Sequence, residues 1–331
     1  MRDSQVETTK VRSELIEKYN QLPALEKKIV QLFSVIYESV NRTALLGCLN
    51  YIGIRDENDK TFVSSSLKPY IDSLLAKDLL VQELRQGPQC NPLIVEIVTR
   101  SAVKAGHFAA MAKAVEDKLP VSTRYRNGTR DFQRQSQLLC QVRMGIYNQD
   151  INFINKKLQD YEKYNNSSEK ISFEDIVEQV CNNPFDSDWC RTLSQELYKS
   201  IITNILINSV LRLSPADEAF TLLEEECSTT GKHNSDYSQM VLAEQQLLRG
   251  NLEKTQQCLE RISDKYTENA AVFWGWLYFL KGENDKAVEY YSRALKYLKK
   301  AKGKNKVYFN TIGGLFFILA LLKDGSINLI K

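Results

Sequence analysis

The chain has 331 residues with only 7 Pro and 14 Gly, and this scarcity of chain breakers favours long helices. The 44 Lys and Arg nearly balance the 41 Asp and Glu, and the net charge of +3 excludes a surface that attracts polyanions as a whole. With only two histidines, His107 and His233, histidine-rich metal sites are excluded, while 43% hydrophobic residues suffice for packed cores.

The first predicted domain spans residues 23–90. In EKKIVQLFSVIYES, apolar residues recur at steps of three and four residues, which places them on one face of a helix. A second helix fits NRTALLGCLNYIGI, with Asn41 as its N-cap and Gly53 as its stop. Both helices are short, so we expect a small helical domain here.

A third apolar helix face lies in residues 61–80, and a short strand-like run and the turn RQGPQ follow it. Three short helices and a small β-turn element resemble a winged-helix domain; a plain three-helix bundle is the alternative. The resemblance implies that the third helix reads DNA, through Thr61, Ser64, Ser65 and Lys68. The acidic neighbours would repel phosphates and favour contact with protein instead: Asp56, Glu57, Asp59, Asp72 and Asp78.

In residues 91–192 the sequence predicts irregular helix pairs. Asn91 followed by Pro92 is a favoured way to open a helix, which we expect to end at Gly106 before an antiparallel partner helix. Another pair fits residues 130–148 and 151–164, with its turn at Asn148. The polar stretch NNSSEKIS is the expected flexible loop, and the chain is irregular near Pro184.

A repeat occupies residues 193–331. Within residues 269–298, small and aromatic residues occur at the spacing of a tetratricopeptide repeat (TPR), which this segment resembles: Gly275, Tyr278, Gly282, Ala287, Tyr291 and Ala294. The resemblance implies that two helices approach closely at the small residues, while Tyr278 and Tyr291 fill the space between successive repeats. The usual tryptophan position is Ala271, with Trp274 and Trp276 nearby.

Further repeats lie on both sides of this one. A shift of 32 residues pairs Gly250 with Gly282, Ala243 with Gly275, Thr255 with Ala287, and Leu259 with Tyr291. Residues 200–214 and 216–227 form a third expected helix pair. Downstream, residues 309–323 form an almost wholly apolar helix with its turn at Gly325. Because solenoid ends normally carry a polar capping helix, we expect that this helix is covered by a longer chain or by a second copy.

Two basic clusters are candidates for nucleic-acid contact. Four arginines beside Tyr125 and Phe132 could hold phosphates and stack on bases: Arg124, Arg126, Arg130 and Arg134. A solvated loop and helix start is the alternative. The second cluster fits equally the favourable placement of lysine at a helix end: Lys296, Lys299, Lys300, Lys302, Lys304 and Lys306.

Contact with a protein partner is expected on the first helices of the repeats, because these line the concave surface of such solenoids. The candidates are Tyr237, Gln239, Gln245 and Gln246. Trp274, Trp276, Tyr278 and Phe279 have helical spacing, which indicates packing rather than a ligand box. Glu224, Glu225 and Glu226 are consecutive on a helix, which indicates a solvated acidic face.

No motif of an enzyme is found in the sequence. Gly231-Lys232 lacks the other residues of a phosphate-binding Walker loop, and no Gly-x-Ser-x-Gly elbow is present. We therefore predict a non-enzymatic segment with no catalytic residue, no cofactor and no metal. The seven cysteines are widely spaced without a two-residue pair, which indicates reduced thiols. Without a signal peptide or a membrane-spanning stretch, a soluble cytoplasmic protein is expected.

The prediction is an all-α protein, in which an N-terminal extension (1–22) and a winged-helix-like domain precede an α-solenoid of TPR-like helix pairs. Its expected function is binding of a protein, a peptide or a downstream domain of the same chain. The alternative is a nucleic-acid-binding regulator. The order of elements, with the segments CNPLIVEIV and GGLFFILALLKDG, is also similar to the amino-terminal accessory region of bacterial Swi/Snf-family helicases. That resemblance implies a regulatory or helicase-type protein with an ATPase motor downstream.

Overall fold

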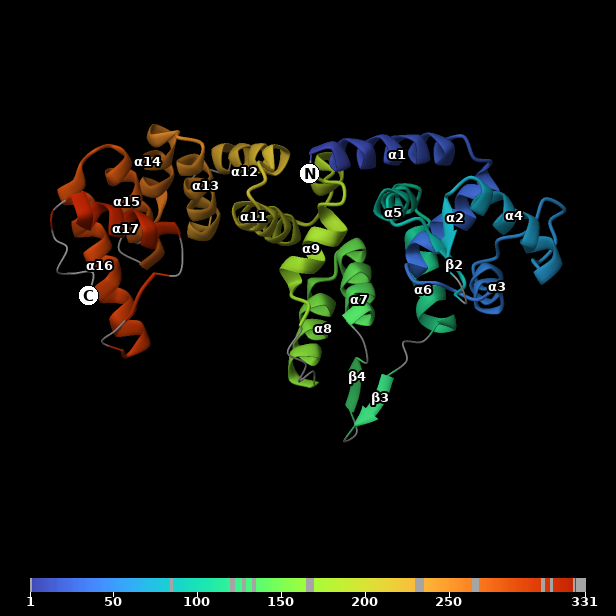
Figure 1. Cartoon of the computed structure of the whole chain (residues 1–331). Helices are drawn as coiled ribbons and strands as arrows, with labels where there is room; N and C mark the ends of the chain where they lie inside the picture. Colours follow the sequence, from blue (N-terminus) through green and yellow to red (C-terminus); the bar gives the residue numbers. More distant parts are fainter. Residues whose placement is uncertain are drawn as a thin grey trace. The chain divides into compact units, whose positions relative to one another are not determined.

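The computed structural model describes residues 2–83, 86–119, 123–126, 129–132, 135–164, 170–229, 235–263, 268–304, 307–309, 312–323 and 325. Within these ranges the chain is almost entirely helical, and its strands pair as two short antiparallel hairpins (Figure 1). The all-α prediction is therefore confirmed. The chain divides into two compact units, Met1–Leu197 and Tyr198–Lys331.

The first unit begins with a helix outside the predicted small domain and continues through further helices to residue 190. In α1 (Arg2–Asn20), the predicted N-terminal extension, Leu15 and Tyr19 are buried against the unit. The other helices are α2 (Ala24–Ile36), α3 (Arg42–Tyr51), α4 (Ser64–Ala76), α5 (Val95–Lys104), α6 (Phe108–Lys118), α7 (Gln135–Asn148), α8 (Ile151–Tyr164), α9 (Phe173–Cys181) and α10 (Ser187–Cys190).

Helices α2, α3 and α4 coincide with the three predicted in residues 23–90. Asn41 caps α3 by accepting a hydrogen bond from the backbone N–H of Ala44 at 2.8 Å, and Gly53 follows the helix with a φ of +71°. The predicted strand-like run is β1 (Leu80–Gln82), which pairs antiparallel with β2 (Pro88–Cys90). The elements of this region were thus correctly predicted.

Gly87 is required by the way this hairpin meets the chain before α3. The backbone N–H of Val40 donates to the carbonyl of Pro88 at 3.2 Å, which adds Val40 to the edge of the hairpin. A Cβ on Gly87 would lie 2.1 Å from the Val40 carbonyl oxygen, so only glycine fits there.

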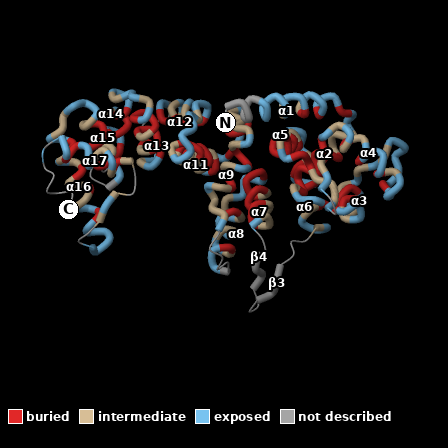
Figure 2. Tube along the Cα trace, viewed as in Figure 1, coloured by how far each residue is buried: buried red, intermediate tan, exposed pale blue. Residues whose placement is uncertain are grey.

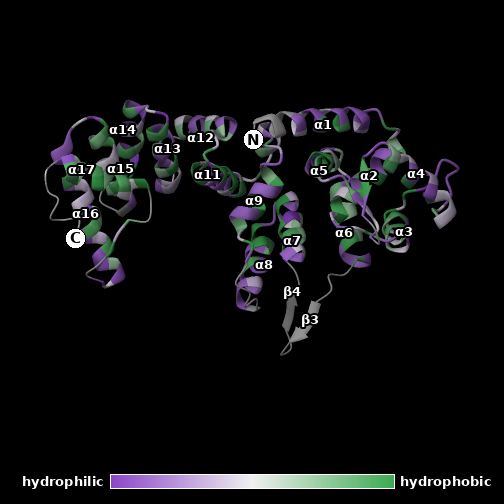
Figure 3. Ribbon diagram, in the orientation of Figure 1, coloured by the Kyte–Doolittle hydropathy of each residue, from purple (hydrophilic) through white to green (hydrophobic). Residues whose placement is uncertain are grey.

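The predicted opening of the next helix at Asn91 and Pro92 was wrong by three residues. Helix α5 begins at Val95, because the Asn91 side chain accepts a hydrogen bond from the Leu93 N–H at 3.0 Å and so forms a turn instead of a cap. The predicted end is confirmed, since Gly106 follows α5 with a φ of +73°. Figures 2 and 3 show that α2 and α5 are rich in buried and hydrophobic residues.

The helix predicted to begin at residue 130 begins at Gln135 instead. Residues before it form a second hairpin, β3 (Thr123–Arg126) and β4 (Thr129–Phe132), in which Tyr125 pairs with Arg130. The predicted turn at Asn148 between α7 and α8 is confirmed. Part of the expected loop NNSSEKIS, residues 165–169, lies outside the described residues.

The second unit consists of helices in the part of it that the structure describes. Two of its helix pairs have their turns at Gly250 and Gly282. The φ values of these glycines, +74° and +80°, lie in the left-handed region that favours glycine. Gly325 follows the last described helix with a φ of +73°. The helices are α11 (Gln195–Arg212), α12 (Asp217–Thr229), α13 (Asp236–Leu248), α14 (Leu252–Arg261), α15 (Glu268–Leu280), α16 (Asn284–Lys302) and α17 (Ile312–Lys323).

The repeat register predicted from the sequence is confirmed in these pairs. Its small and hydrophobic positions are buried, with exposed fractions of 2% or less: Ala219, Ala243, Thr255, Leu259, Ala287, Tyr291 and Ala294. Gly275 lies against the ring of Tyr291, whose atoms would be 2.8–2.9 Å from an added Cβ. The two helices of the pair therefore approach closely at Gly275, and the fold of this unit is a TPR-like helical repeat.

One aromatic position differs from the TPR expectation. Tyr291 does pack between successive pairs, with its ring 5.1 Å from Phe317 of α17. Tyr278 instead stacks on Trp274 at 5.7 Å and on Tyr290 at 5.3 Å, which belong to its own pair. The expectation that Tyr278 fills the space between repeats is therefore wrong, because its ring completes an aromatic stack within α15 and α16.

The cysteines are all free, and six of the seven are buried. Burial raises the pKa of Cys48 and Cys258 to about 11 and that of Cys90, Cys140 and Cys227 to about 12. Few thiolates therefore exist at neutral pH.

We expect the folded protein to react slowly with Ellman's reagent at neutral pH, because buried thiols with raised pKa values are poor nucleophiles. The same sample in guanidinium chloride should titrate all seven cysteines rapidly. A thiol that reacts as fast in the folded protein as in the denatured one would contradict this expectation.

Candidate protein-interaction surfaces

A buried polar cluster joins α5 and α7 in the first unit. The Arg143 Nε donates to both Glu96 oxygens, at 2.9 and 3.0 Å, and the Tyr147 hydroxyl donates to Glu96 Oε2 at 2.7 Å. Arg143 also donates to Thr99 Oγ1, and the Thr99 hydroxyl lies 3.0 Å from that of Ser34. Because these groups are buried and satisfy one another, the cluster holds helices together rather than binding a ligand.

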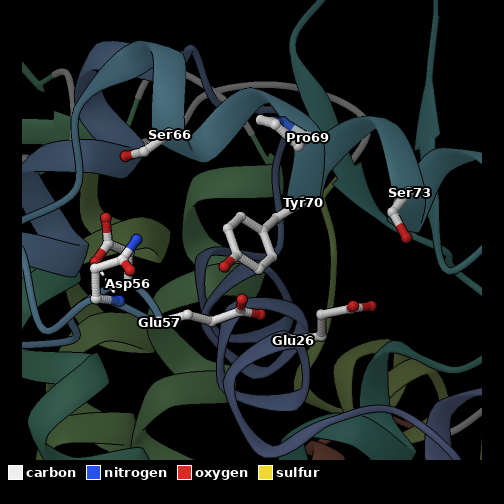
Figure 4. Close-up of a pocket in the computed structure, with 8 residues that line it drawn as sticks. Glu26, Asp56, Glu57, Ser66, Pro69, Tyr70 and Ser73 are labelled. Carbon is white, nitrogen blue, oxygen red and sulfur yellow. Dashed lines mark hydrogen bonds between the residues drawn. The ribbon is translucent and has the colours of Figure 1, made fainter.

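An open cavity of about 420 Å³ lies beside α4. Figure 4 shows Tyr70 at its centre, with the hydroxyl directed toward Asp56 and Glu57. Burial and the charge of the nearby Glu57 carboxylate raise the pKa of Tyr70. The lining residues are Glu26, Asp56, Glu57, Asn58, Ser66, Pro69, Tyr70 and Ser73.

The charge of this cavity bears on the predicted DNA-reading helix. Thr61, Ser64, Ser65 and Lys68 are exposed on α4 or just before it, as that interpretation requires. However, the adjoining cavity presents three carboxylates, of which Glu26 pairs with Lys77 at 2.8 Å. Such a surface repels phosphate groups and favours cationic groups. Binding of nucleic acid by Lys68 stays a prediction.

The predicted arginine cluster lies on the second hairpin. Arg124 and Arg126 belong to β3 and Arg130 to β4, while Arg134 lies outside the described residues. In the backbone register Arg124 is opposite Asp131 and Tyr125 is opposite Arg130. The arginines are therefore carried by a hairpin, not by the helix start that the sequence suggested, and their role in binding nucleic acid stays a prediction.

Three of the four predicted partner-binding residues are in the interior, which corrects that prediction. Gln239, Gln245 and Gln246 have exposed fractions of 1–2%, whereas Tyr237 is 52% exposed. Gln245 Nε2 donates to the Leu206 carbonyl at 3.0 Å, which ties α13 to α11. Their place on the first helix of a repeat suggested an exposed concave surface, but the amides of Gln245 and Gln246 supply hydrogen bonds between neighbouring helices.

The acidic run at Glu224 is also less solvated than expected. Gln246 and Lys254 both donate to Glu224 Oε1, at 2.9 and 2.7 Å. The hydrogen bond from Lys254 lowers the pKa of Glu224. Glu226 lies 3.1 Å from the Lys199 ammonium, and its side chain is only 11% exposed. Two of the three carboxylates therefore link helices of the second unit.

An exposed apolar surface lies on α17. Its exposed face consists of four aliphatic side chains at steps of three, one and three residues, which form one continuous stripe along the helix. Their exposed fractions are 56% for Leu315, 43% for Ile318, 38% for Leu319 and 48% for Leu322. We call these four residues the α17 stripe.

Sequence reasoning found the apolar helix but not this stripe. Nearly every residue of α17 is apolar, so hydrophobic periodicity gave no signal for the exposed face. The opposite face is covered within the unit: Phe316 stacks on Trp276 at 4.8 Å, and Phe317 packs 5.1 Å from Tyr291. Contact with α15 and α16 therefore selects which residues of α17 remain uncovered.

Lysines surround the α17 stripe in the sequence. Between Glu289 and Asp324 every charged residue is basic, and the structure places Lys296, Lys299, Lys300, Lys302 and Lys304 on exposed positions at the end of α16. None of these five forms an ion pair with a residue that the structure describes. No helix within the described ranges has the length and apolarity needed to cross a bilayer.

Comparison with known proteins adds little to this geometry. No protein-family model matches the chain, and no curated protein matches it significantly. A solved structure with some similarity is a signal transduction ATPase with numerous domains (STAND) that has a tetratricopeptide repeat sensor, from Pyrococcus horikoshii. The identity is 14% and the TM-score 0.28; the match covers 95% of this chain and 49%, about half, of that protein. At this TM-score the match supports no argument.

Proposed function

We propose that this chain is a non-enzymatic scaffold that binds a protein partner through its TPR-like repeat unit. The observation on which the proposal rests is the α17 stripe, an apolar face of four residues on a helix whose other side packs into the repeat. Soluble proteins rarely leave contiguous apolar surface uncovered unless it binds something. The buried repeat positions of α15 and α16 pack closely and provide a rigid support for such a face.

A photo-crosslinking amino acid at Leu315 tests the scaffold proposal. In cells that make the protein, we expect a discrete protein adduct on irradiation, because Leu315 is 56% exposed within the stripe. The matched control is the same amino acid at Leu211, which is 79% exposed on α11 and outside the stripe. Equal crosslinking at both positions, or none at Leu315, would refute a binding role for α17.

For the first unit we propose a winged-helix-like domain that contacts protein. Three helices followed by the β1–β2 hairpin, with Val40 hydrogen-bonded to the hairpin edge, support this assignment. The acidic cavity beside α4 favours a protein-contacting role over DNA reading. The similarity to the accessory region of Swi/Snf helicases stays a prediction.

We expect the chain to bind duplex DNA weakly, without the steep salt dependence of a DNA reader. A protein with 6–10 phosphate contacts loses about 10³–10⁵ in affinity between about 50 and 200 mM salt. Electrophoretic or anisotropy titrations at both salt concentrations measure this. Tight binding that weakens by such a factor, and that is lost on joint replacement of Arg124, Arg126 and Arg130, would instead establish the nucleic-acid-binding regulator.

A further inference from the structure

The residues of the α17 stripe occupy repeat positions that helices cover elsewhere in the unit. Alignment of the turn residues Gly282 and Gly325 pairs Ile318 with Gly275 and Leu319 with Trp276. Gly275 lies under Tyr291 of the helix that follows, and Trp276 stacks on Phe316 of the next repeat. An aliphatic stripe one helix wide at these positions fits a helix rather than an extended peptide.

The side chain at Ile318 excludes a covering helix of the repeat's own kind. In the two preceding pairs the equivalent residue is small, Ala243 or Gly275, and the second helix approaches closely there. The larger side chain of Ile318 prevents such a close approach. A helix on this face must therefore pack at a larger separation, through interdigitated side chains. This favours a helix from another protein over a second helix formed by the residues after Gly325.

The charge near the stripe indicates what flanks that helix. Asn284, at the start of α16, donates to the carbonyl of Ala320, while Tyr291 contacts Phe317 and Phe309, so α16 and α17 run antiparallel. The lysine-rich end of α16 therefore lies toward the first turns of α17, and Lys323 lies at its last turn. Basic groups near the first turns of α17 are complementary to acidic residues on a partner.

A second copy of the chain fits this surface poorly. Two lysine-rich surfaces would repel one another in a symmetric pair. The exposed face of a single 12-residue helix is also small beside the roughly 1,200–2,000 Å² that a stable dimer buries. Resting on the proposed scaffold function, we propose that the α17 stripe binds an amphipathic helix of another protein, whose apolar seam is flanked by Asp and Glu.

Fluorescence anisotropy with synthetic helices tests the proposal on the whole chain. The probe is a labelled peptide of about three heptads with Leu and Ile in its seam and Glu at the flanking positions; the matched peptide has Lys there. We expect the Glu peptide to bind and the Lys peptide to bind at least about tenfold more weakly. Failure of the Glu peptide to bind at about 100 μM, or equal binding of both peptides, would overturn the proposal.

Two sets of variants locate the binding. Ile318→Glu with Leu319→Glu should weaken binding of the Glu peptide at least about tenfold, because an ionised group on the stripe opposes burial. Leu211→Glu, on an exposed leucine elsewhere, should leave it unchanged. Lys299→Glu with Lys300→Glu should weaken the Glu peptide and strengthen the Lys peptide. Circular dichroism checks that each variant is folded, and unchanged binding in the stripe variant would refute the site.

Three further measurements distinguish other occupants of the face, and each overturns the proposal if positive. Stripe-dependent binding to vesicles of phosphatidylserine and phosphatidylcholine, without peptide binding, would assign the face to a membrane. Concentration-dependent dimerisation lost on Ile318→Glu would assign it to a second copy. A gain in peptide affinity when the chain ends after Gly325 would assign it to residues 326–331. A protein adduct at Leu315 without binding of the Glu peptide would leave the scaffold function standing and refute the acidic helix alone.

Discussion

Replacing Arg143 with methionine is expected to lower the free energy of unfolding of the first unit by about 3–5 kcal/mol. Arg143 and Glu96 are each about 1% exposed, and the Nε of Arg143 lies 2.9 Å from Glu96 Oε1. The substitution would leave the Glu96 carboxylate buried without its counterion, and such a charge costs far more than the pair itself contributes. This is the largest effect expected in the first unit.

The surroundings of Arg143 keep its guanidinium charged. The guanidinium lies over the rings of Tyr37 and Tyr147, at 4.6 and 5.2 Å from their centres. Burial opposes its charge, but the Glu96 carboxylate more than offsets this and raises the pKa of Arg143. Burial, together with the charge of Glu96, also raises the pKa of Tyr147. Arg143 is therefore a cation throughout the pH range in which the protein can be studied.

Hydrogen exchange under denaturant, followed by mass spectrometry of peptides from α5 and α7, measures the effect within the first unit. The matched control is Arg55→Met, because Arg55 is half exposed and its pairing with Asp59 at 3.9 Å contributes little; a change below about 0.5 kcal/mol is expected. Replacing Glu96 and Arg143 together with methionine should recover part of the loss. A loss no larger for Arg143→Met than for Arg55→Met would contradict this account.

Replacing Tyr291 with alanine is expected to cost about 3–5 kcal/mol in the second unit. The ring of Tyr291 is fully buried and fills the space between Gly275, Phe309 and Phe317. Its removal would leave a cavity where α15, α16 and α17 meet, because the ring fills the space over Gly275. The α17 stripe depends on this support, so peptide binding should weaken as well.

Replacing Tyr291 with phenylalanine distinguishes the contribution of the ring to stability from that of the hydroxyl. The Tyr291 hydroxyl is buried and has no hydrogen-bond partner among the described residues. Tyr291→Phe should therefore leave stability unchanged or raise it by up to about 1 kcal/mol. Hydrogen exchange of peptides from α15 and α16 measures both variants. Equal destabilisation by alanine and phenylalanine would show that the hydroxyl, not the packing of the ring, stabilises the unit.

Local features of this protein could be predicted because they depend on neighbouring residues. The cap at Asn41, the stops at Gly53 and Gly106 and the turns at Gly250 and Gly282 follow from side-chain hydrogen bonds and from the freedom of glycine at positive φ. The repeat register could be found because TPR-like pairs need small residues at fixed spacings. The predicted helix start at Asn91 was wrong, because the Asn91 side chain forms a turn with the Leu93 N–H instead of capping the helix.

The candidate surface was decided by contacts between residues distant in the sequence. Glu96 and Arg143 are 47 residues apart, and the sequence around neither residue predicts a buried ion pair. Gln245 and Gln246 looked like surface residues until hydrogen bonds from other helices placed them inside. The sequence alone determined that α17 is apolar. Only packing against Trp276 and Tyr291 decided that Leu315, Ile318, Leu319 and Leu322 stay exposed, because a helix that is hydrophobic all round has no face that its own sequence can assign to solvent.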